Sequence, residues 1–68
     1  MKWKLWTQNE IIGKGFDEYD SKDAALERAC GIIRHQRRVK VLYIEEPDGK
    51  RIEHEETEAW CKKRAARN

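Results

Sequence analysis

The spacing of apolar residues predicts one amphipathic helix around which the rest of the chain is arranged. Over residues 20–36, apolar side chains recur every three or four positions and fall on one side of a helix. Either Asp20 or Ser21 can cap its first turn, because both side chains accept a hydrogen bond from a free backbone N–H. The apolar side of this helix consists of Ala25, Leu26, Ala29, Cys30, Ile32 and Ile33. The two alanines are small enough to let the helix lie close to a sheet.

Residues 2–8 alternate in the manner of a β-strand. Trp3 and Leu5 share one face, while Lys4 and Trp6 share the other. We expect Trp3 and Leu5 to face the helix, and Trp6 to lie on the opposite face of the sheet beside lysines.

A turn and a short second strand are expected next. Residues 9–15 contain two glycines, which favour a turn, and residues 16–19 can pair back with the first strand. The pattern does not place Ile11 and Ile12, which lie in or near this turn.

Residues 39–45 have the strongest strand signal, because they are rich in β-branched and aromatic residues. Strict alternation puts Val41 and Tyr43 on one face and Leu42 and Ile44 on the other. Apolar residues on both faces indicate a strand that is at least partly covered on both sides.

The chain then predicts a hairpin and a second helix. Residues 46–49 combine Pro47, Asp48 and Gly49 in a sharp turn, and residues 50–53 return as a strand with Ile52 as its apolar residue. Glutamates at the start of residues 54–67 and cations at the end suit a helix dipole. In this helix Trp60 is the expected anchor, and residues 64–68 are expected to fray.

These elements predict a single small α+β domain over residues 1–68. Its sheet is antiparallel with about four strands, in the order ββαββα, with the central helix on one face and a C-terminal helix appended. A chain of this length buries only about 60% of its unfolded surface. The core should therefore be thin, and self-association as a homodimer is one way to extend it.

The charges are nearly balanced, with 15 basic and 13 acidic residues and a net charge of +2. This excludes the strong positive field that nucleic-acid-binding proteins usually have. Basic residues do cluster over 28–40 and 62–67, and acidic residues over 45–58. Matching of charges to helix dipoles accounts for these clusters more simply than a binding role does.

The N-terminal residues lack the apolar core and cleavage site of a signal peptide, and no apolar run reaches membrane-spanning length. Together with two cysteines, this leads us to expect reduced thiols and a cytoplasmic location. Cys30 and Cys61 could form a disulfide only if the two helices packed on one sheet face with Cα atoms within about 7 Å. Free thiols are the expectation.

The chain resembles a family of small uncharacterised bacterial proteins, the domain-of-unknown-function group numbered 2188, which has a ββαββ layout. The resemblance covers most of residues 2–53, and the helix around Trp60 departs from it. It implies a fold and no activity. The residues that carry it are Trp3 to Trp6, the aromatic and helical stretch from Phe16 to Ala29, and Asp48-Gly49-Lys50.

No metal, cofactor or catalytic motif emerges. Cys30 and His35, and likewise His54 and Cys61, do not have the close spacing of structural zinc ligands. His54 and Cys61 are seven positions apart, roughly 10 Å along a helix, which is too far for a nucleophile and its base. We expect no enzymatic activity, because no set of convergent polar groups is present.

Binding through the surface is the remaining class of function. We expect a non-enzymatic cytoplasmic module that contacts a protein partner or a second copy of itself, and no membrane. The alternative is a nucleic-acid-binding accessory protein, since basic and aromatic faces bind phosphates and stack bases. The residues expected in the interaction surface are Lys2, Lys4, Trp6, Arg34, Arg37, Arg38 and Lys40.

Overall fold

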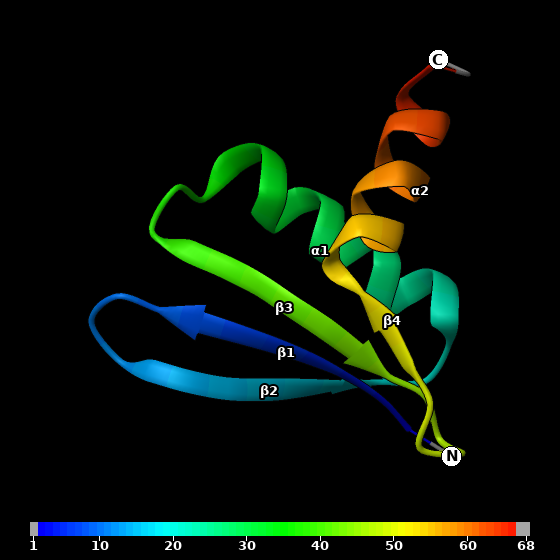
Figure 1. The fold of residues 1–68 in the computed structure, drawn as a ribbon, viewed down its shortest axis with the longest axis horizontal. Coiled ribbons are helices and arrows are strands. Elements are labelled where there is room, and N and C mark those ends of the chain that lie inside the picture. The colour runs from blue at the N-terminus through cyan, green and yellow to red at the C-terminus, as the bar shows by residue number, and fades with distance from the viewer. Residues whose placement is uncertain (1, 67–68) are drawn as a thin grey trace.

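The computed structural model describes residues 2–66 and confirms the α+β class and the order ββαββα (Figure 1). Four strands form one sheet, and two helices follow the second and fourth strands. The elements are β1 (Trp3–Asn9), β2 (Gly13–Tyr19), α1 (Lys22–His35), β3 (Val39–Glu45), β4 (Arg51–Glu53) and α2 (His54–Ala66). Helix α2 thus continues through three of the residues expected to fray, 64–66, while residues 67–68 lie outside the described part.

The sheet has the strand order β2-β1-β3-β4, with every neighbouring pair antiparallel. Strands β1 and β3 are therefore central, although 29 residues separate the end of one from the start of the other. Strand β2 forms one edge over seven residues, and β4 forms the other over only three.

The hairpin between β1 and β2 is longer than the sequence predicts, because β2 begins at Gly13 and not at Phe16. The first half of β2 contains two glycines, which have no side chains and so show no alternating pattern that would indicate a strand. The Asn9 side chain accepts hydrogen bonds from the backbone N–H groups of Ile11 and Ile12, at 2.7 and 3.2 Å. Gly13 completes the turn at φ 97°, and both isoleucines project into solvent.

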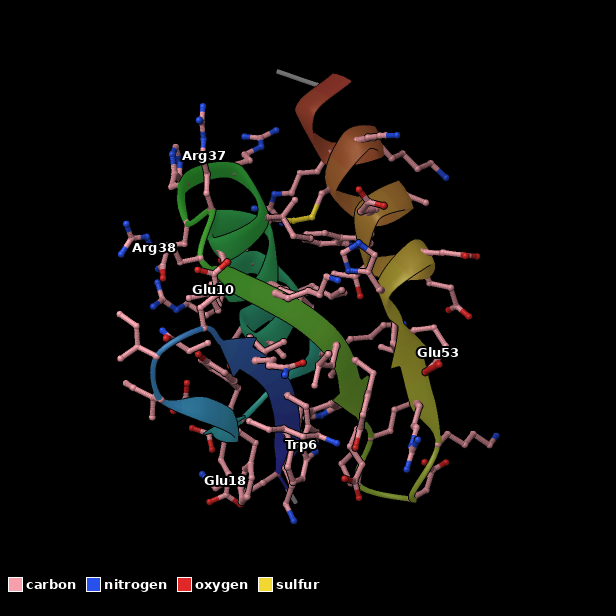
Figure 2. The ribbon with its side chains drawn as sticks, turned by 60° about the vertical axis from the view of Figure 1, so that its left-hand side comes forward. Trp6, Glu10, Glu18, Arg37, Arg38 and Glu53 are labelled. Carbon is pink, nitrogen blue, oxygen red and sulfur yellow. A yellow bond between two sulfur atoms is a disulfide. The ribbon has the colours of Figure 1, made fainter. Side chains whose placement is uncertain are left out.

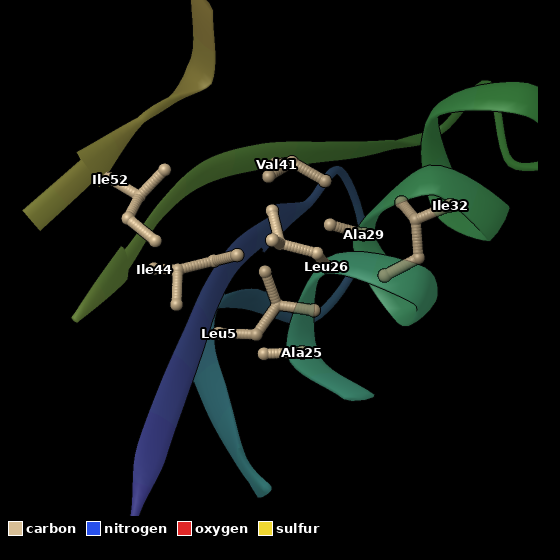
Figure 3. Close-up of a cluster of buried hydrophobic side chains, with 8 residues drawn as sticks. All are labelled: Leu5, Ala25, Leu26, Ala29, Ile32, Val41, Ile44 and Ile52. Atoms are coloured by element: carbon tan, nitrogen blue, oxygen red, sulfur yellow. The ribbon is translucent and has the colours of Figure 1, made fainter. Parts of the chain in front are cut away.

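Helix α1 covers one face of the sheet with the predicted apolar side. Its cap is Ser21, whose hydroxyl accepts a hydrogen bond from the N–H of Ala24 at 3.1 Å. Ala25 and Ala29 are fully buried, which brings the helix close to the central strands. Figure 3 shows the resulting core, made of Leu5, Ala25, Leu26, Ala29, Ile32, Val41, Ile44 and Ile52.

Strict alternation along β3 is the one feature of this strand that the sequence predicted wrongly. Trp6 of β1 pairs with Tyr43, but the next residue, Thr7, pairs with Val41, so Leu42 is an extra residue in a β-bulge. A bulge reverses the alternation beyond it. Val41 and Ile44 consequently both enter the core, and Tyr43 faces the opposite side of the sheet.

The turn between β3 and β4 has the predicted chemistry. The Gly49 N–H donates to the Glu46 carbonyl at 2.9 Å, and Gly49 itself has φ 95°. The Lys50 N–H donates to the Asp48 carboxylate at 3.0 Å. Ile52 then enters the core, as expected.

Helix α2 follows β4 directly and lies beside α1 (Figure 1). Trp60 packs against the core as predicted, and Thr57 is fully buried. The expectation of free thiols was wrong: Cys30 of α1 and Cys61 of α2 form a disulfide, with Cα atoms 5.6 Å apart. The physical reason is that both helices pack on one face of the sheet, the arrangement that brings these positions within bonding distance. No helix in the described residues is long and apolar enough to cross a membrane.

Candidate interaction surface

The outer face of the sheet, which is the face turned away from α1, carries a row of three aromatic side chains. Trp6 of β1 is central, opposite Phe16 of β2 and Tyr43 of β3. Its ring centroid lies 4.7 Å from that of Phe16 and 5.9 Å from that of Tyr43. Both separations are in the range of favourable ring contacts. We call Phe16, Trp6 and Tyr43 the aromatic row.

The aromatic row exists because directly opposed residues on neighbouring strands place their side chains on the same face. Phe16 is 45% exposed, and Trp6 and Tyr43 are half-buried by one another and by their neighbours. Within residues 2–66, both helices pack on the other side of the sheet, where they share the core and the disulfide. The rings are therefore accessible to a partner.

Each ring of the aromatic row has a cation above it. Such contacts are attractive by about 0.5–1 kcal/mol at exposed sites, weak enough for the cation to be displaced. The outer face therefore presents apolar rings under charged groups that can move to a ligand. The ammonium nitrogens of Lys4 and Lys14 lie 5.1 Å from the Phe16 centroid and 5.6 Å from the Trp6 centroid, and the guanidinium of Arg51 lies 4.4 Å from the Tyr43 centroid.

Carboxylates share the outer face with these cations. The indole N–H of Trp6 donates to Glu45 at 3.1 Å, which fixes the orientation of the ring. Glu18 lies opposite Lys4 across β1 and β2, and Glu53 lies opposite Tyr43 across β3 and β4. In Figure 2 Glu18 and Trp6 both lie toward the lower end of the view. The face is thus mixed in charge.

Five of the seven residues predicted for the interaction surface lie on or next to the outer face. Lys4, Trp6 and Lys40 are on it, since Lys40 pairs with Gln8 on the Trp6 side of β1. Arg37 and Arg38 lie in the loop before β3 and border a surface cavity of about 300 Å³ with Gln8, Glu10 and Lys40. Figure 2 shows both arginines near Glu10, at the opposite end of the sheet from Glu18.

The other two predicted residues lie outside the strands, Arg34 on α1 and Lys2 just before β1. Arg34 lines the groove between the two helices. Lys2 forms an ion pair with Asp20. Hydrogen bonding and the opposite charge raise the pKa of Lys2 and lower the pKa of Asp20.

Three rings or cations of this face, Phe16, Lys14 and Arg51, were not predicted for the surface, and Tyr43 with Val41 was only one of two pairs that could have joined Trp6 there. The alternation of residues 14, 16 and 18 could have placed Lys14 and Phe16 beside Trp6, had β2 been extended back to its glycines. Tyr43 and Arg51 could not be placed, because the bulge at Leu42 follows from the pairing of two strands distant in the sequence.

The groove between α1 and α2 is a second concave region, of about 360 Å³. The disulfide forms part of its wall, and Glu27 and Arg64 form an ion pair across it. Gly31, Arg34, His35 and the ring of Trp60 complete the lining. The ion pair between Glu27 and Arg64 joins the two helices. We therefore assign this groove a structural role, in which it holds α2 against α1.

The histidine and cysteine candidates for catalysis or metal binding make structural contacts instead. The ring of His54 hydrogen-bonds to the Val41 carbonyl at 2.9 Å and lies 3.4 Å from the carboxylate of Glu58. Cys61 is in the disulfide and is not available as a thiolate nucleophile. Among residues 2–66, no three histidine, cysteine or acidic side chains come close enough together to hold one metal ion.

In comparisons with known proteins, no family model, no curated protein and no solved structure matches this chain. The likeness to the domain-of-unknown-function group 2188 therefore stays a prediction from the residues. A function for this protein has therefore to be inferred from the side chains of the outer face.

Proposed function

We propose that this protein is a non-enzymatic binding module that holds a protein partner on the outer face of its sheet. The observation that carries the proposal is the aromatic row, in which three rings stand side by side on a face that neither helix covers. Tryptophan, tyrosine and arginine are the residues that most often dominate protein interfaces.

The charges of the outer face favour a protein over a polyanion as the partner. The strands place Lys4, Lys14, Lys40 and Arg51 on this face together with Glu18, Glu45 and Glu53. A surface of mixed sign attracts a partner that carries both charges and apolar groups. The expected partner has apolar or aromatic side chains that contact the rings and carboxylates that draw the lysines and Arg51 away from them.

The proposal retains the cytoplasmic location expected from the sequence, and the disulfide makes that location testable. The cytoplasm keeps most protein thiols reduced, whereas oxidising compartments preserve disulfides. Alkylation of freshly lysed cells, followed by mass measurement, reports which state Cys30 and Cys61 have in the cell. Two alkylated cysteines support the cytoplasmic location, and two protected cysteines contradict it.

The binding role is tested by removing rings of the aromatic row. Phe16→Ser and Tyr43→Ser should each weaken retention of partner proteins from a nuclease-treated extract by about tenfold or more, since each loses an interface ring. Lys62→Glu, an exposed position on α2, is the matched control and should retain the same proteins. The proposal fails if variants that keep the wild-type circular dichroism spectrum also keep wild-type retention.

A single-stranded nucleic acid is the second candidate, favoured by the basic residues at one end of the outer face. Lys40, Arg37 and Arg38 lie together there and could bind phosphates while bases stack on the rings. Titration with a single-stranded oligonucleotide should quench Trp6 fluorescence, and the affinity should fall linearly with salt on a logarithmic scale. An absent or salt-insensitive signal would remove this candidate.

A further inference from the structure

Strand β2 is a long, open edge of the sheet. It has seven residues, contains no proline, and pairs on one side only, with β1. The opposite edge, β4, has three residues and leads directly into α2. Exposed edges of this kind offer unpaired backbone N–H and C=O groups to another strand. We propose that two copies of this chain pair through antiparallel β2 strands, which joins their sheets into one.

The register of this pairing follows from the strand itself. β2 spans Gly13–Tyr19, so an antiparallel pairing over its full length has its two-fold axis at Phe16. Phe16 then lies opposite Phe16 of the partner subunit. Lys14 lies opposite Glu18 of the partner subunit, and the symmetry repeats this contact with the roles exchanged. Directly opposed side chains of opposite charge stabilise a strand pair.

Other registers lose this complementarity. In a joined sheet the outer faces of the two copies lie on the same side. The register can therefore shift only in steps that keep each outer-face residue opposite another outer-face residue. One shift sets Asp17 opposite Asp17 of the partner subunit, which brings two like charges together. The other sets Lys14 opposite Phe16 of the partner subunit and shortens the overlap. The register centred on Phe16 is the one with full overlap and two opposed ion pairs.

The other face of β2 has room for the second copy. Gly13 and Gly15 have no neighbouring heavy atom within 4 Å of the position where a side chain would begin, and they border a groove of about 330 Å³ beside α1. In the proposed register, Tyr19 of the partner subunit lies opposite Gly13. The Tyr19 ring packs against the core of its own chain, and Gly13 offers no side chain that could clash with it. Asp17 lies opposite Gly15, where there is no opposing side chain to clash with it.

The pairing would lengthen the aromatic row. Phe16 stands at the β2 end of the row, 4.7 Å from Trp6, so Phe16 of the partner subunit would continue it into the second copy. The two outer faces would then form one surface related by a two-fold axis. This inference concerns self-association and holds whatever the outer face binds.

Charge exchange at two positions tests the inference. Lys14→Glu and Glu18→Lys should each raise the dimer dissociation constant by about tenfold or more, because each sets like charges opposite one another. The double variant Lys14→Glu/Glu18→Lys restores the opposed charges and should again sediment as a dimer. An equimolar mixture of the two single variants should also form a dimer, since each supplies the charges that the other lacks. Lys62→Glu, with the same charge change on α2, should behave as wild type.

Sedimentation velocity over a concentration series measures all six samples, wild type included. A wild-type mass of one chain at the highest attainable concentration overturns the inference. A dimer that persists in both single variants also overturns it, because the contact then lies elsewhere. If the single variants dissociate but neither the double variant nor the mixture recovers, the register is wrong. Loss of partner retention in Tyr43→Ser, whose residue lies on β3 away from this contact, with the dimer intact, would separate the two proposals.

Discussion

Thr57 is a polar residue that belongs to the core. Its side chain is fully buried, and its hydroxyl donates to the carbonyl oxygen of Glu53 at 3.2 Å. Glu53 is the last residue of β4, so this bond ties the first turn of α2 to the end of the sheet. Burial of a hydroxyl is tolerated here because its hydrogen bond replaces the one lost to water.

We expect Thr57→Val to lower the free energy of unfolding by about 1 kcal/mol, because it keeps the volume of the side chain but removes the hydrogen bond. Thr57→Ala should cost more, since it also leaves a cavity. Urea denaturation of the three proteins measures both effects. A valine variant as stable as wild type would show that the hydroxyl contributes nothing.

The pair Lys2–Asp20 gives a pH-dependent contact at the surface. The hydrogen bond from Lys2 and its charge hold the pKa of Asp20 below its ordinary value of 3.8, and the same pair raises the pKa of Lys2 above 10.5. The contribution of Asp20 to stability is therefore present above pH 3.8 and is lost as pH falls through its lowered pKa. The contribution of Lys2 is present below pH 10.5 and is lost as pH rises through its raised pKa.

Lys2→Gln should return the titration midpoint of the Asp20 carboxyl toward 3.8, as measured by side-chain carbon chemical shifts in NMR. The change in overall stability should be small, because both side chains are exposed to solvent. High salt should move the wild-type midpoint in the same direction. An unchanged midpoint in the variant would mean that the pair does not persist in solution.

At the level of elements, α2 is held mostly by a few specific contacts and only slightly by apolar burial. Its buried residues include Thr57 and Cys61, with Trp60 packed at the margin of the core. The disulfide to Cys30 and the ion pair between Arg64 and Glu27 join it to α1. The covalent link is therefore the main restraint on this helix.

Replacing both cysteines, as Cys30→Ala/Cys61→Ala, should lower the free energy of unfolding by about 4 kcal/mol. The bridge spans 31 residues, and a loop of that size restricts the unfolded chain by this order. Amide hydrogen exchange should accelerate more in α2 than in α1. A dithiol reductant should reproduce the effect in wild type and leave the alanine variant unchanged; equal exchange in both helices would contradict this account.

Considered as a whole, the molecule depends on one thin layer of side chains between the sheet and α1. Leu26 is the central member from the helix, with only 1% of its surface exposed. Leu26→Ala should lower the free energy of unfolding by about 2–5 kcal/mol, a large fraction of what a small domain has. Ile12→Ala, at an isoleucine that is 87% exposed, should change it by less than about 0.5 kcal/mol.

Thermal unfolding followed by circular dichroism and by tryptophan fluorescence compares these two variants. Because there is one core, both signals should report a single transition at the same temperature. A Leu26→Ala midpoint close to that of wild type would mean that the core lies elsewhere.

The sequence by itself determined the order of the elements and, for β1 and α1, the side that is buried. Periodic spacing is a local property, so the apolar side of α1, the facing of Trp3, Leu5 and Trp6, and the turn at Gly49 could all be predicted. Part of the interaction surface could be predicted for the same reason, since alternation along one strand places Lys4 and Trp6 on the same face. The start of β2 could not be predicted, because Gly13 and Gly15 have no side chains to show an alternating pattern.

The tertiary structure alone decided which distant residues meet. The bulge at Leu42 arises from pairing between β1 and β3, and it moves Tyr43 onto the outer face beside Trp6. The packing of α2 beside α1 brings Cys30 and Cys61 together, although nothing in their spacing indicates it. Both outcomes depend on the relative placement of elements far apart in the chain, and a local pattern of polar and apolar residues contains no information about that placement.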